Sequence, residues 1–84
     1  MKQLKRLIAV YEEDLVVKGH YFKVVRSKDV LKDEDDSLFE LSYQGYFVAG
    51  TIRSYKGLIE VAEAYLTGDK QTLVDAKSKN CLIY

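Results

Sequence analysis

Apolar and polar residues alternate with a period of two in two neighbouring pairs of segments. Within each pair, a two-residue connection ending in Gly supplies the positive φ angles that a tight hairpin needs. The pattern therefore predicts two β-hairpins, which are residues 15–17 with 20–26 through Lys18-Gly19, and residues 38–43 with 46–52 through Gln44-Gly45. Gly50 interrupts the last of these strands, which indicates a bulge or a close backbone approach.

The period changes to three and four after residue 54, as it does on the apolar side of an amphipathic helix. The apolar positions with this spacing are Leu58, Val61, Ala62 and Tyr65. Ser54 is a favourable N-cap residue and Gly68 is favourable just beyond the C-terminus, so the sequence predicts a helix between them. Gly57 in its first turn weakens the start of this helix by about 1 kcal/mol relative to Ala.

A second, shorter helix is predicted over residues 70–78, because Asp69 can act as its N-cap. Its inward-facing residues are expected to be Leu73, Val74 and Ala76. Residues 81–84 are apolar enough to end the chain as a short strand.

Residues 2–14 fit two interpretations. Apolar residues at helical spacing are Leu4, Leu7, Ile8, Tyr11 and Leu15. The basic residues at the start of this segment and the acidic residues at its end, however, oppose the helix dipole at both termini. The continuous apolar run over residues 7–11 also suits a buried strand, so a strand is favoured and a helix is the alternative.

The fold class that follows is α+β. A chain of 84 residues has room for one small core, so residues 1–84 are interpreted as a single globular domain. An antiparallel meander of about four strands, built from the two hairpins and followed by one or two C-terminal helices packed on one face, buries both sets of apolar residues at once.

Charge is balanced overall but unevenly distributed. The chain has 13 basic and 13 acidic residues, which excludes a polycationic tail protein and an acidic nucleic-acid mimic. Four adjacent carboxylates at residues 33–36 predict a surface loop, and Asp33, Asp35 and Asp36 are candidate contact residues there. A calcium loop is disfavoured, because Leu38 and Gln44 occupy the positions where an EF-hand has Gly and Glu.

Catalytic and metal-binding side chains are few. One Cys and one His exclude an internal disulfide and a structural zinc site, and no glycine-rich phosphate-binding motif is present. His20 follows a predicted turn and Cys81 lies in the last apolar segment, so each has a structural explanation. We therefore expect no enzyme activity, no cofactor and no metal.

No segment resembles a membrane anchor or a secretion signal. The apolar run over residues 7–11 is far shorter than the roughly 20 residues of a membrane helix. We expect a cytoplasmic protein without a membrane partner, and the single Cys agrees with a reducing compartment.

Aromatic residues give the main indication of function. Seven Tyr and three Phe exceed what so small a core needs. If Phe22 and Phe47 pack beneath the helices, strand alternation turns Tyr21 and Tyr46 outward. Exposed Tyr is enriched in protein interfaces, and beside Lys and Arg it also forms a platform for single-stranded bases. The candidate binding residues on the sheet are Tyr21, Lys23, Arg26, Tyr43 and Tyr46.

The favoured function is a small non-catalytic domain that binds another protein and acts as a modulator or inhibitor of a larger host protein. Lys outnumbers Arg and both Pro and Trp are absent, from which we expect a prokaryotic or phage origin. A homodimer formed through an open strand edge is an alternative assembly. The alternative function is a nucleic-acid-binding module with a basic patch formed by Lys18, Lys23, Arg26 and Lys28.

Overall fold

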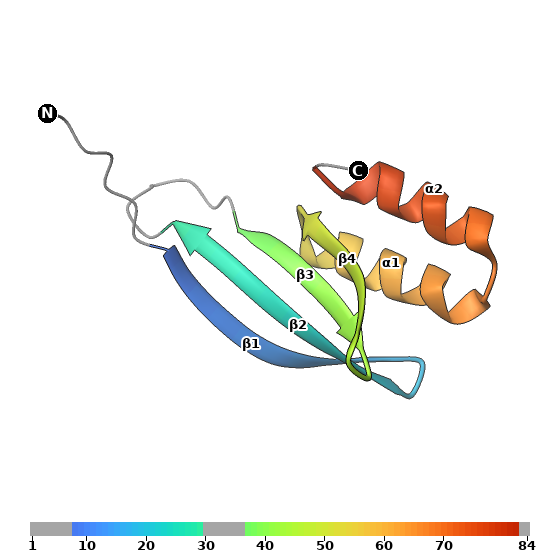
Figure 1. The fold of residues 1–84 in the computed structure, drawn as a ribbon, viewed down its shortest axis with the longest axis horizontal. Coiled ribbons are helices and arrows are strands. Elements are labelled where there is room, and N and C mark those ends of the chain that lie inside the picture. Colours follow the sequence, from blue (N-terminus) through green and yellow to red (C-terminus); the bar gives the residue numbers. More distant parts are fainter. Residues whose placement is uncertain (1–7, 30–36, 83–84) are drawn as a thin grey trace, which may run out of the picture.

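The computed structural model describes residues 8–29 and 37–82. Four antiparallel strands form one sheet in the order β1-β2-β3-β4, and two helices follow (Figure 1). The elements are β1 Ile8–Val17, β2 His20–Asp29, β3 Leu38–Tyr43, β4 Tyr46–Ile52, α1 Tyr55–Thr67 and α2 Lys70–Asn80. The predicted α+β meander with C-terminal helices is confirmed.

Both hairpins turn as their sequences predict. Lys18 and Gly19 have φ angles of 51° and 81°, and Gln44 and Gly45 have φ angles of 50° and 85°. Two successive positive φ angles define the type I′ turn, whose twist matches that of the strands it joins. The strand interpretation of residues 2–14 is confirmed from residue 8 onwards, because β1 runs through the apolar and the acidic parts of that segment alike.

The core lies between the sheet and α1. The face of the sheet that α1 covers, called the helix-side face, contributes the buried residues Leu15, Val17, Phe22, Val24, Leu41, Val48, Ala49 and Ile52. The predicted stripe of α1 is confirmed, since Leu58, Val61 and Ala62 are fully buried and Tyr65 packs against the same cluster. The helix α2 packs mainly on α1 and on β4, so it lies outside the core (Figure 1).

The helix α2 presents a narrower apolar side than expected. Leu73 and Ala76 pack against the core, as predicted, but Val74 is exposed. Successive helical residues point about 100° apart, and only one narrow side of α2 faces α1. Val74 therefore falls outside the contact although it directly follows Leu73.

Hydrogen bonds confirm both predicted ends of α1 and the predicted start of α2, whereas α2 extends to Asn80, beyond the predicted end at residue 78. Ser54 Oγ accepts from the backbone N of Gly57 at 3.0 Å, and Asp69 Oδ2 accepts from the backbone N of Thr72 at 3.2 Å. Gly68 has a φ angle of 76° and its N–H donates to the carbonyl of Tyr65. The first helix thus begins and ends where its sequence predicts.

The segment after α2 closes part of the edge of β4. Cys81 forms one isolated antiparallel bridge with Ile52, in place of the predicted final strand. The N–H of Leu82 donates to the carbonyl of Thr51 at 2.7 Å, and the N–H of Arg53 donates to the carbonyl of Asn80 at 3.2 Å. Of the predicted strand over residues 81–84, only residues 81 and 82 are described, and they make this bridge and the hydrogen bond to Thr51. The predicted residues 83–84 lie outside the described residues.

Candidate functional site

The helices leave the other side of the sheet, called the open face, uncovered. Cross-strand partners lie on the same face, so the register assigns each side chain to one face or the other. The exposed large apolar residues that this register places on the open face are Ile8, Val10, Val16, Tyr21 and Phe47. Half of the exposed large apolar residues of the described chain therefore gather on one face.

A charged belt crosses the middle of the open face. It is formed by Glu12, Asp14 and Lys23, with Glu40 opposite Val25 on the neighbouring strand. Lys23 Nζ lies 3.4 Å from Asp14 Oδ1, and both side chains are mostly exposed. Three carboxylates against one ammonium group leave the belt with a net charge of about −2 at neutral pH.

The belt separates two apolar ends. Val16 is paired with Tyr21 beside the hairpin turns, and Phe47 lies at the same end of β4. Val10 is aligned with Leu38 through Ser27 at the other end. A shallow hollow of about 170 Å³ lies at this second end, lined by Val25, Ser27, Leu38, Phe39, Glu40 and Thr51. Along its length, the open face therefore has an apolar end, an acidic middle and a second apolar end.

The structure divides the sequence-predicted binding residues between the two faces. Tyr21, 71% exposed, and Lys23 lie on the open face. Arg26 lies on the helix-side face, where it is aligned with Phe39. Tyr43 is on that face too, half-buried against the rings of Phe22 and Tyr65 with centroid distances of 4.9 and 5.5 Å.

Strand alternation alone explains why Lys23 and Arg26 lie on different faces. Lys23 and Arg26 are three positions apart in one strand, and an odd separation places side chains on opposite faces. The three acidic candidates Asp33, Asp35 and Asp36 lie outside the described residues.

Tyr46 and Phe47 depart from the expectation that Phe packs inward. Tyr46 is paired with Tyr43, so it points to the helix-side face, where it is 72% exposed at the turn. Phe47 is 65% exposed on the open face, and its ring lies over Gly50, where a Cβ atom would be 3.2 Å from Cζ of Phe47. Register shifts in β4 after this point break the simple alternation, as the glycine indicated. Phe47 is therefore an open-face residue that sequence analysis missed, as are the aliphatic residues of that face and the carboxylates of the belt.

A second hollow lies on the helix-side face beside the start of α1. Its volume is about 390 Å³, and it is lined among others by Glu13, Arg26, Ser37, Phe39, Arg53 and Tyr55. Arg26 and Arg53 are 27 positions apart in the sequence, and no local spacing could have associated them. Only the fold brings these two guanidinium groups to one pocket.

The single His and the single Cys of the chain lie at opposite ends of the sheet. His20 follows the first hairpin turn, and its Nδ1 is 3.0 Å from the hydroxyl of Tyr43. Cys81 is buried beside Ile52, at the far end of β4. Burial raises the pKa of the Cys81 thiol and so disfavours the thiolate form.

Two further properties concern metals and membranes. Within residues 8–29 and 37–82, no group of three His, Cys, Asp or Glu side chains is arranged to hold a metal ion. Neither α1 nor α2 has the length and the apolar character that a membrane crossing requires.

Comparisons of this chain with protein-family models, with curated proteins and with solved structures find no match. The assignment of a function therefore rests on the arrangement of side chains described above.

Proposed function

We propose that this chain is a small non-catalytic domain that binds another protein through the open face of its sheet. The observation that supports this proposal is the arrangement of side chains on that face. Exposed apolar side chains lie at both ends, and an acidic belt lies between them. Tyr21 and Phe47 are the type of large, rigid side chain that carries much of the binding energy in protein interfaces.

The belt also specifies the chemistry of the partner. A complementary surface would place Lys or Arg over Glu12 and Glu40 and apolar residues over the two ends. A second copy of this chain stacked on the same face would bring carboxylates onto carboxylates. We therefore infer that the partner is a different protein with a basic centre in its contact surface. A domain of this size would act by covering that surface, as a modulator or an inhibitor does.

The charge distribution favours a protein over a nucleic acid. The basic residues of the predicted patch are divided between the two faces. Lys23 lies on the open face, whereas strand alternation places Arg26 and Lys28 on the helix-side face. Lys23 itself is paired with Asp14. Phosphate binding requires several cations along one surface, and the open face has a surplus of carboxylates.

A capture experiment with matched variants tests this proposal. The double substitution Tyr21→Ser with Phe47→Ser removes two aromatic groups from the open face, one on β2 and one on β4, at the end of the sheet beside the hairpin turns. The control, Tyr46→Ser with Val74→Ser, removes exposed apolar groups from elsewhere on the surface. Both variants should retain the wild-type circular dichroism spectrum, because all four side chains are exposed.

The expected result is a protein that binds the wild type and the control equally and binds the open-face variant at least about tenfold more weakly. Its binding should also weaken when salt is raised from about 50 to about 500 mM, since the belt contributes charge pairs. Equal binding by both variants, or loss of the captured protein after nuclease treatment, would contradict the proposal.

A further inference from the structure

The pocket beside α1 contains the guanidinium group of Arg26, which has no salt-bridge partner among the described residues. Arg26 is half-buried, its Nε donates to Ser37 Oγ at 3.2 Å, and its guanidinium carbon lies 5.4 Å from the ring centre of Tyr11. Ser37 is only 7% exposed, so it fixes the guanidinium group from within the protein. Among the described residues, no carboxylate lies within 4 Å of Arg26, although Glu13 lines the same pocket.

A half-buried cation of this kind costs free energy unless an anion accompanies it. Removal of an ionised group from water carries a desolvation penalty that pairing can offset. Among the described residues, the one hydrogen bond of Arg26 comes from its Nε and its one ring contact is with Tyr11, so its terminal N–H groups are available. These groups can donate to a carboxylate in the bidentate geometry that guanidinium favours.

Arg53 supplies a second cation from the segment that joins β4 to α1. It lies between β4 and the N-cap of α1, and the hydrogen bond from its backbone N–H to the carbonyl of Asn80 fixes its position. Its side chain is exposed and lines the pocket. An anion in the pocket would therefore meet guanidinium groups from two walls.

The rest of the lining indicates the size and charge of the ligand. Two arginines and Glu13 leave a net charge of about +1 in the pocket, which one negative charge neutralises. The rings of Phe39 and Tyr55 meet edge to face, 6.2 Å between centroids at 74°, and offer an apolar wall beside the cations. These features suit a carboxylate attached to an apolar group better than a doubly charged phosphate.

We propose that this pocket binds a monocarboxylate with an adjoining apolar group, clamped between Arg26 and Arg53. The carboxylate has two sources, a free organic acid or the C-terminus of a peptide that ends in an apolar residue. The pocket lies on the helix-side face, so this proposal does not depend on binding at the open face, and either can fail alone.

NMR titration of the backbone amides with 3-phenylpropionate tests the proposal. Saturable shifts should concentrate on residues 11–13, 26, 37–39 and 53–55, and 3-phenylpropionamide should cause none. Arg26→Gln and Arg53→Gln should each weaken binding about tenfold, because each removes a charge-assisted hydrogen bond. Lys70→Gln, which removes an exposed cation from α2, should leave binding unchanged.

Arg53 is exposed, so Arg53→Gln keeps the test valid if Arg26→Gln perturbs the fold. A dipeptide ending in Phe that binds more tightly than 3-phenylpropionate, and loses binding on amidation, would identify the peptide C-terminus as the source. Tighter binding by the free acid would identify an organic acid. The absence of saturable shifts, a wild-type affinity in Arg53→Gln, or tighter binding of inorganic phosphate would overturn the proposal.

Discussion

Gly57, in the first turn of α1, lies close to both α2 and the sheet. A Cβ atom at this position would lie 3.0 Å from Oδ1 of Asn80 and 3.1 Å from Cγ2 of Ile52. Both neighbours are held, since Ile52 is fully buried and Asn80 is hydrogen-bonded. A glycine that lowers the helix propensity of α1 therefore permits its close packing.

We predict that Gly57→Ala destabilises the protein despite that propensity. Ala gains about 1 kcal/mol as a helix former, whereas displacement of packed neighbours typically costs about 1–3 kcal/mol. The free energy of unfolding in urea should fall by about 1 kcal/mol. Lys56→Ala, an exposed change at the preceding position, should stay within about 0.5 kcal/mol of the wild type. A more stable Gly57→Ala variant would show that Asn80 moves away without loss.

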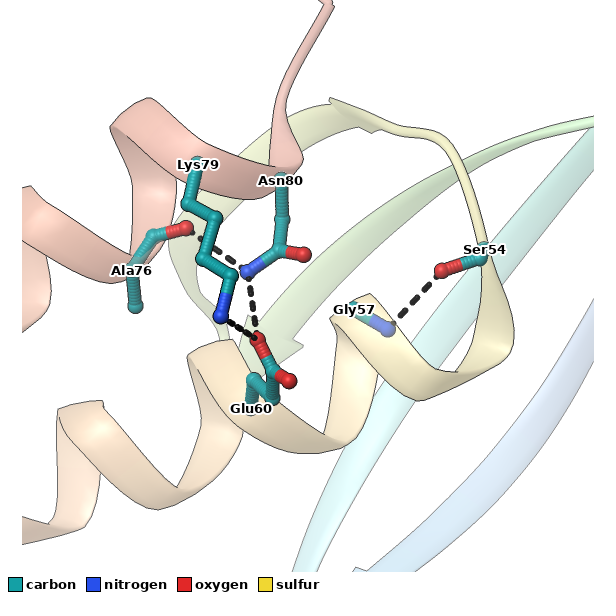
Figure 2. A network of polar contacts seen from close by, with 6 residues as sticks. All are labelled: Ser54, Gly57, Glu60, Ala76, Lys79 and Asn80. Atoms are coloured by element: carbon teal, nitrogen blue, oxygen red, sulfur yellow. Dashed lines mark hydrogen bonds and ion pairs between the residues drawn. The ribbon is translucent and has the colours of Figure 1, made fainter.

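Asn80 joins the two helices through Glu60. Its Nδ2 donates to Glu60 Oε1 at 3.1 Å and to the carbonyl of Ala76 at 2.9 Å, while Lys79 Nζ lies 3.7 Å from the same carboxylate oxygen (Figure 2). The hydrogen bond from Asn80, followed by the charges of Lys79 and Lys56, lowers the pKa of Glu60. The ionised carboxylate is thus favoured in the folded state.

This lowered pKa predicts a specific pH dependence. The stabilisation from Glu60 is complete above its unfolded-state pKa and is lost as pH falls through the lower pKa of the folded state. The difference in unfolding free energy between the wild type and Glu60→Gln should therefore be constant near neutral pH and shrink below about pH 4. Glu63→Gln, an exposed change on the same helix, serves as the control and should show a smaller pH-dependent difference. A difference that does not change with pH would exclude this role of the Glu60 charge.

The strand β1 is an edge strand, and no other described strand pairs with its outer side. Its outer backbone groups extend over ten residues, whereas residues 80–82 cover the last part of β4. Three adjacent carboxylates, Glu12, Glu13 and Asp14, lie in the middle of β1. Charged residues on an edge strand oppose pairing with another strand, and antiparallel pairing of two copies about the middle of β1 would bring these groups together.

We therefore predict that removal of these charges promotes the homodimer considered above. The triple substitution Glu12→Gln, Glu13→Gln and Asp14→Asn should form dimers or larger assemblies at concentrations where the wild type is monomeric. Sedimentation velocity at neutral pH measures this change. A control variant, Glu63→Gln with Asp75→Asn, removes two carboxylates from the helices and should sediment like the wild type. A monomeric triple variant would show that charge does not protect this edge.

Elements whose signals are local were predictable from the sequence. The hairpin turns and the helix caps each depend on two to four adjacent residues, and the structure confirms them. The orientation of Phe47 was predicted wrongly, because alternation places Tyr46 and Phe47 on opposite faces without indicating which of the two faces the helices cover. The pocket of Arg26 and Arg53 also lacked a sequence signal, since its walls come from β1, β2, β3 and the start of α1.

At the scale of the whole molecule, a balanced composition conceals two surfaces of opposite character. The open face has an acidic belt between apolar ends, and the helix-side face has a small cationic pocket beside the start of α1. The sheet is the common wall of both. Net charge alone could not reveal this arrangement, because strand alternation separates side chains that are adjacent in the sequence.

The order of the strands in the sheet has a consequence for biosynthesis. Each strand pairs with its neighbour in the sequence, so the sheet closes only short loops and can form early as the chain leaves the ribosome. The helix-side face of the sheet, however, stays uncovered until α1 has been synthesised. Nascent chains that end before Tyr55 would expose residues such as Phe22, Val24 and Leu41 to water. The interval between synthesis of β4 and synthesis of α1 is therefore the period when aggregation or chaperone binding is favoured.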